Sequence, residues 1–157
     1  MEGESWFRRS RRIYSSLSTI LNSVLLIRII IAFVFISEGI QKFLYPNDLG
    51  IGRFIAIGIP APEIMAPFVG VVEITCGTLI LLGFLTRLAT FPLIIDMLVA
   101  IASTKLPILM SKGFWKMAHE ARTDFSMLLG LIFLVIVGSG TSSLDQLSQN
   151  HTPEKSA

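Results

Sequence analysis

The sequence contains a single cysteine, Cys76, among its 157 residues. Membrane enzymes that make or transfer disulfides need a pair of cysteines, so this chain cannot carry out that chemistry alone. Cys76 lies within an apolar stretch, where a free thiol is most simply a small packing residue. We therefore predict no disulfide couple in this protein.

Histidine is almost as scarce, with two residues in the chain. A haem held by two histidines needs both of them at membrane depth, whereas His151 lies in the polar C-terminal segment. No spacing of cysteine and histidine matches a zinc site. No glycine-rich phosphate loop follows a strand, because no strand is predicted. The sequence therefore predicts neither a haem nor a metal site.

Charged residues make up only 15% of the chain, while 52% of residues are hydrophobic and the mean hydropathy is +0.70. A soluble domain of this length carries about a quarter charged residues. The composition therefore indicates an integral membrane protein in contact with the lipid bilayer. Four spans of roughly 20 residues would use most of a chain of this length.

The apolar runs predict an all-α fold, a transmembrane four-helix bundle over residues 20–138. The spans are expected at about 20–44, 63–84, 87–109 and 123–137, with 110–122 as a polar, aromatic connection. The connection 47–62 is too apolar for a free loop, and we expect it to pack on the end of the bundle. Lys42 and Pro46 are followed about 63 residues later by Lys105 and Pro107, a repeat that also fits two tandem helical hairpins.

The two ends of the chain are polar. Residues 1–19 form a basic leader that contains Arg8, Arg9, Arg11 and Arg12. Basic flanks of membrane spans stay in the cytoplasm, so we interpret this cluster as an anchor and not as a nucleic-acid site. Four spans then place both termini in the cytoplasm. The segment 139–157 is predicted to be a flexible polar tail.

Two carboxylates interrupt the apolar runs. Glu73 lies roughly 15 Å along the second span and Asp96 about 14 Å along the third, both near the centre of a ~30 Å hydrocarbon layer. Ionisable residues at this depth are costly and mark candidate functional sites. Should Glu73 lie close to another carboxylate, one of the two is expected to hold its proton near neutral pH.

The small residues around Glu73 predict where its side chain points. Ala66, Gly70, Glu73 and Gly77 share one helix face, and small residues at this spacing let helices approach closely. Glu73 should therefore face a neighbouring helix. We predict an outer polar pocket that binds a small polar or amphipathic ligand, formed by Glu38, Lys42, Glu73, His119, Glu120, Arg122 and Asp124.

Structural explanations for these charges remain open. Buried charges can simply pair and fix the register of helices. Arg28 and Asp96 are predicted to form such a structural ion pair in the cytoplasmic half. Glu38 with Lys42 could equally be a structural pair or part of a ligand site, whereas a structural clamp is favoured for Arg122 with Asp124 or Glu73.

Several stretches together resemble the DoxX family of small membrane proteins. They are GIQKF at 39–43, GVVE at 70–73, LGFLTRLA at 82–89, GFW at 113–115 and HEARTDF at 119–125. The resemblance covers about residues 28–140. It implies a four-helix protein of the cytoplasmic (inner) membrane of a bacterium. Relatives named DoxD belong to a thiosulfate:quinone oxidoreductase, and others are linked to redox defence or to quinone stress. The family supplies no agreed catalytic residues.

Three functions follow from the pocket and the resemblance. The first is a redox-linked membrane subunit that binds quinone or a related small amphipathic molecule. The second is a non-catalytic partner that assembles or anchors another membrane or redox complex. The third is a small-solute or proton-coupled transporter, because carboxylates inside membranes also serve proton relays. A pocket that mixes a cation, carboxylates and apolar walls favours the first, whereas whether the chain is itself an enzyme stays open.

Overall fold

The computed structural model describes residues 2–140 and 143–145, with side chains from residue 23 onward. Within this part of the chain every regular element is helical. In chain order they are α1 (Glu2–Leu44), α2 (Ile51–Ala56), α3 (Pro62–Leu82), α4 (Thr86–Ala100), the π-helical turn η1 (Ile101–Lys105), α5 (Leu106–Lys112) and α6 (Phe114–Val137). The predicted all-α class is confirmed. The side chains of the basic leader and residues 146–157 of the predicted tail lie outside the described residues.

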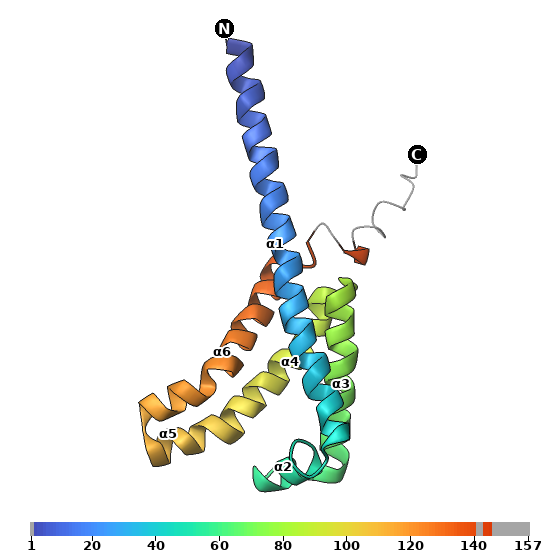
Figure 1. Cartoon of the computed structure of the whole chain (residues 1–157), viewed down its shortest axis with the longest axis vertical. Coiled ribbons are helices and arrows are strands. Elements are labelled where there is room, and N and C mark those ends of the chain that lie inside the picture. Colours follow the sequence, from blue (N-terminus) through green and yellow to red (C-terminus); the bar gives the residue numbers. More distant parts are fainter. Residues whose placement is uncertain (1, 141–142, 146–157) are drawn as a thin grey trace, which may run out of the picture.

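The helices form two hairpins (Figure 1). In the first, α1 and α3 pack along each other and α2 contacts α3, so the connection 47–62 packs on the bundle as expected. In the second, α4, η1 and α5 run outward and α6 returns along them. The hairpins are joined through the short turn between α3 and α4, where Gly83 adopts a left-handed conformation with φ 69°.

The core lies where all four long helices meet, beside the α3–α4 turn. Away from this end, α5 and the start of α6 diverge from α1 and α3 (Figure 1). The hairpins therefore share one packed end and separate toward the other. The buried apolar residues include Val24, Ile31, Phe35, Cys76, Ile80, Leu93, Met127, Leu131 and Leu134.

Among the described residues, three helical segments are long and apolar enough to cross a membrane: Ser23–Leu44, Pro62–Leu82 and Thr86–Lys112. They agree with the first three predicted spans. The predicted fourth span, 123–137, is not among them, so a four-span bundle is not confirmed. The uncharged part of α6, residues 125–137, extends only about 20 Å, which is shorter than the hydrocarbon layer of ~30 Å.

Residues 110–122 were predicted to be a connection between spans, but they are almost entirely helical. Gly113 alone separates α5 from α6, with φ 80°, a conformation that glycine adopts without strain. The residues that follow include good helix formers, and Lys116 pairs with Glu120 one helical turn later. Helix propensity thus extends α6 back to Phe114.

Candidate functional site: a lysine and three carboxyls between the hairpins

Glycines bring α1 and α3 into close contact. A Cβ atom added at Gly39 would lie 2.7 Å from the Gly70 carbonyl oxygen and 3.1 Å from Glu73 Cβ. Gly77 lies against Ile36 of α1 in the same way. The predicted small-residue face of α3 is therefore the face that meets α1. Glu73 is buried on that face, as expected.

This contact places Lys42 of α1 beside Glu73 of α3. The Lys42 ammonium donates a hydrogen bond of 2.6 Å to Glu73 Oε2, and the two side chains are only 11% and 3% exposed. Both residues belong to candidate membrane spans. An ion pair withdrawn from solvent in this way leaves either partner costly without the other.

Asp96 of α4 completes the arrangement. Its carboxyl interacts electrostatically with Glu73, with Lys42 and with Glu38. Glu73 lies nine residues before the end of α3 and Asp96 ten residues after the start of α4, so both are about 15 Å from the turn that joins these helices. Glu38, Lys42, Glu73 and Asp96 are called the Lys42 cluster below.

The chemistry of the cluster follows from its charges. With both carboxyls ionised and Lys42 positive, Lys42, Glu73 and Asp96 together carry one negative charge, which is costly in a medium of low dielectric constant. One proton held between the two carboxyls would make this trio neutral. The arrangement offers an ammonium donor next to an exchangeable proton.

The predicted pocket divides into separate parts. Asp124 does not join Glu73 and instead accepts a bond of 2.9 Å from Lys105 of η1. His119 and Arg122 interact with each other on the exposed side of α6 at 3.0 Å. Glu120 pairs with Lys116 at 3.0 Å on the same exposed stretch, and this hydrogen bond lowers the pKa of Glu120. Of the seven predicted residues, Lys42 and Glu73 are in direct contact, and Glu38 lies one helical turn before Lys42 on α1.

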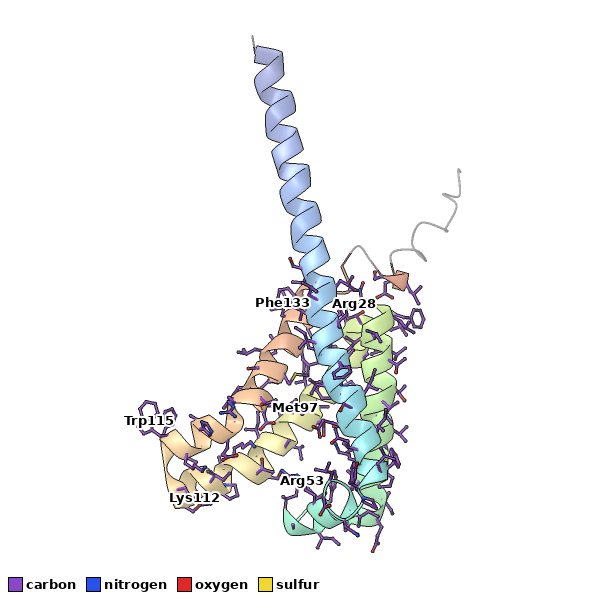
Figure 2. The ribbon with its side chains drawn as sticks, viewed as in Figure 1. Arg28, Arg53, Met97, Lys112, Trp115 and Phe133 are labelled. Carbon is purple, nitrogen blue, oxygen red and sulfur yellow. The ribbon has the colours of Figure 1, made fainter. Side chains whose placement is uncertain are left out.

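The predicted ion pair between Arg28 and Asp96 is not formed. Arg28 is 1% exposed, and its guanidinium donates to the carbonyl oxygens of Ile80 (2.8 Å), Leu81 (2.7 Å) and Ser139 (2.9 Å). Figure 2 shows Arg28 at the packed end of the bundle. The last carbonyls of a helix lack intrahelical partners, and Arg28 supplies donors for those of α3. Asp96 lies deeper, beside Glu73.

The first residues of the predicted flexible tail are held at the same end. The Asp145 N–H donates to the Gly83 carbonyl oxygen at 3.1 Å, and Asp145 Oδ1 accepts from the Leu85 N–H at 2.9 Å. Ser143 is buried. Asp145 is therefore docked on the α3–α4 turn. Its carboxylate also lies at the start of α4, where the helix dipole favours negative charge.

Sequence reasoning missed Lys105 and the π-helical turn that carries it. Pro107 has no N–H to continue the helical hydrogen bonds, and its ring crowds the carbonyl four residues earlier, at Ser103. The turn widens at this point, and the hydroxyls of Ser103 and Thr104 bond to carbonyls of the preceding turn. Proline near the end of a long span was the available signal for this irregularity.

The DoxX family model matches residues 23–106, which is more than half of the chain. A Mycobacterium tuberculosis protein, called an uncharacterized membrane protein, is 59% identical over 130 residues, covering 79% of this chain and 80% of its own length. The chain belongs to the DoxX family. A Haemophilus influenzae protein, called uncharacterized, is 34% identical over 124 residues, covering 76% of this chain and 85% of its own length. No solved structure matches the chain.

The family match contains the whole Lys42 cluster of this DoxX protein. The match begins at residue 23, within α1, and ends one residue after Lys105, so α6 lies outside it. The part that the DoxX model recognises is thus the first hairpin together with α4 and η1. We therefore place the candidate site of this DoxX protein at the Lys42 cluster and not at the ionisable residues of α6.

Replacing Gly39 by alanine is expected to destabilise the protein by about 1–3 kcal/mol, because the new Cβ would crowd backbone and side-chain atoms of α3. Thermal unfolding in mild detergent measures the effect. Gly130→Ala is the matched control, since its Cβ would meet only the flexible end of Ile31 and alanine favours the helix. Equal unfolding temperatures for the two variants would contradict the tight α1–α3 contact.

Proposed function

We propose that this DoxX-family membrane protein binds the headgroup of a quinone, or of a related small amphipathic redox molecule, at the Lys42 cluster. The observation that carries the proposal is the Lys42–Glu73 pair, 2.6 Å long and only 11% and 3% exposed, which lies inside the candidate spans. A quinone carbonyl oxygen needs a hydrogen-bond donor, which Lys42 provides. The apolar surfaces of the helices suit an isoprenoid tail.

The carboxyl pair suits the proton chemistry of such a ligand. Reduction of a quinone to a quinol takes up two protons and two electrons, and oxidation releases them. Glu73 and Asp96 can hold and return a proton next to the bound headgroup. A partner redox protein would supply or accept the electrons, which makes this chain the membrane subunit of a redox-linked system.

The same proposal includes the placement of the chain. The cytoplasmic membrane of a bacterium fits a DoxX protein, and the basic residues Arg8 to Arg12 favour a cytoplasmic N-terminus. We further propose that residues 123–137 of α6 enter the membrane beside α4 as a short fourth crossing, since their apolar side packs into the shared core. Both termini then lie on the cytoplasmic side.

Purification from native membrane in mild detergent, followed by mass spectrometry, tests the proposal. We expect bound quinone in the wild type and none in the double variant Lys42→Met/Glu73→Gln, which removes both charges of the pair. The double variant Lys116→Met/Glu120→Gln removes an exposed pair of the same kind and should keep its quinone.

Other results of the same experiment would support a different function or a different binding site. A stoichiometric protein partner with no quinone would support the role of assembling or anchoring another membrane complex. Protein with neither quinone nor partner, whose solute uptake depends on pH and on Glu73, would support a proton-coupled transporter. Quinone retained by the Lys42→Met/Glu73→Gln variant would place the ligand outside the Lys42 cluster.

A further inference from the structure

The chain from α5 into the first turns of α6 extends beyond the length that a membrane crossing needs. The 15 residues of α4 and the five of η1 already extend about 30 Å, which is the thickness of the hydrocarbon layer. The seven residues of α5 add about 10 Å to the same candidate span. We call residues 106–122, which comprise α5 and the first turns of α6, the elbow. The elbow therefore lies at the level of the lipid headgroups.

The elbow exposes apolar and charged side chains together. Every residue from Leu109 to Lys116 is exposed. Met110 is 85% exposed, Trp115 84% and Phe114 58%. Figure 2 shows Lys112 and Trp115 where α5 meets α6, on the side away from α1 and α3. Charged groups are costly in hydrocarbon and large apolar groups are costly in water, so this mixture fits the interface between the two.

The charges of the elbow select the kind of lipid that it suits. Residues 106–122 contain three cations, Lys112, Lys116 and Arg122, and one carboxylate, Glu120, which gives a net charge of +2. Among the residues that the structure describes, Lys112 has no ion-pair partner. Lys116 donates to Glu120 at 3.0 Å, and both side chains are about half exposed. The elbow therefore presents free positive charge beside exposed aromatic rings.

We propose that the elbow binds the phosphate of an anionic phospholipid, with Lys112 as its main cation and Lys116 beside it. Lysine binds phosphate as a point charge, and Glu120 competes with the phosphate for Lys116. Phe114 and Trp115 pack edge to face, with ring centroids 5.3 Å apart, and anchor the elbow among the headgroups. The lipid site shares no residue with the Lys42 cluster, so it goes beyond quinone binding and does not depend on it.

The depth of Trp115 tests the placement. Trp6 is the other tryptophan of the chain, so Trp6→Phe leaves Trp115 as the single indole. This variant is reconstituted in phosphatidylcholine vesicles whose bromine atoms lie either near the headgroup or near the end of the acyl chain. Bromines near the headgroup should quench Trp115 at least about twice as strongly, because an interfacial indole lies at headgroup level. Equal or stronger quenching by bromines at the chain end, or no quenching by either, would overturn the placement.

The choice of lipid tests the phosphate site. Wild type and variants are placed in nanodiscs of equal parts phosphatidylcholine and phosphatidylglycerol, and native mass spectrometry measures the ratio of phosphatidylglycerol to phosphatidylcholine that stays bound. Wild type should favour phosphatidylglycerol, and Lys112→Gln should lower the ratio roughly fivefold. Glu120→Gln should raise it, because Lys116 loses its competing carboxylate.

Arg53→Gln is the matched control for Lys112→Gln. Arg53 is an exposed cation of α2 and lies at the same end of the bundle as Lys112 (Figure 2), outside the elbow. Its replacement should leave the lipid ratio unchanged. A ratio that Lys112→Gln leaves unchanged, or that Arg53→Gln lowers by the same factor, would refute a phosphate site at the elbow.

Discussion

Replacing Lys42 by methionine is expected to lower the free energy of unfolding by about 3–5 kcal/mol, because the Glu73 carboxyl would stay buried without its cation. Methionine retains most of the length and apolar stem of lysine, so the loss reports the charge and not a cavity. Denaturant or thermal unfolding in mild detergent measures it. The effect should be among the largest of any single substitution in the first hairpin.

The double variant Lys42→Met/Glu73→Gln separates the pair from its surroundings. Replacing both charges removes the unpaired carboxylate, so most of the lost stability should return. Lys116→Met provides the matched control, since its pair with Glu120 is exposed on α6 and is worth only about 0.3–0.5 kcal/mol. If Lys42→Met and Lys116→Met unfold at the same denaturant concentration, the Lys42–Glu73 pair does not stabilise the protein.

Replacing Arg28 by methionine is expected to cost about 3 kcal/mol or more. Three carbonyl oxygens, two from α3 and one after α6, would lose the bond that the guanidinium donates in a buried or partly buried place. Arg28→Lys should recover little, because an ammonium cannot reproduce the fixed geometry of a guanidinium. Hydrogen exchange should report faster opening of the Leu85 and Asp145 amides, which hold the segment after α6.

Arg53 provides the control for Arg28. It lies on the short helix α2 and is exposed, so Arg53→Met should change stability by no more than about 0.5 kcal/mol. A small effect of Arg28→Met, together with unchanged exchange at Asp145, would show that the guanidinium does not tie α1, α3 and the chain after α6 together.

Several features of the site were predictable from sequence because they follow from helix geometry. The spacing of Gly70, Glu73 and Gly77 fixes one helix face, and that face packs on α1. The sequence also indicates that Glu73 and Asp96 lie at the same depth, because the two residues are at almost equal distances from the α3–α4 turn. The predicted pair of Asp96 with Arg28 was wrong, because it relied on their opposite charges and not on the nearly equal depths of Asp96 and Glu73.

Other features carry no comparable signal. The partners of Arg28 are backbone carbonyl oxygens. Every residue has one, so no pattern of side chains predicts which of them Arg28 contacts. The separation of the α6 charges from Glu73 depends on how far the two hairpins diverge, and that follows from the tertiary packing and the π-helical turn. The polar, aromatic composition of residues 110–122 suggested a connection between spans, whereas the helix propensity of residues 114–122 makes them the first turns of α6.

The distribution of charge between the hairpins bears on how the protein is inserted during synthesis. Lys42 and Glu73 both belong to the first hairpin, and Lys105 and Asp124 both belong to the second. Each hairpin can therefore leave the insertion machinery with these opposite charges already matched. Asp96 meets Glu73 only when the two hairpins dock. If the second hairpin fails to dock, the Asp96 carboxyl stays inside the bilayer without Glu73 beside it. This unmatched carboxyl distinguishes an unassembled chain from a folded one, and membrane quality control can recognise it.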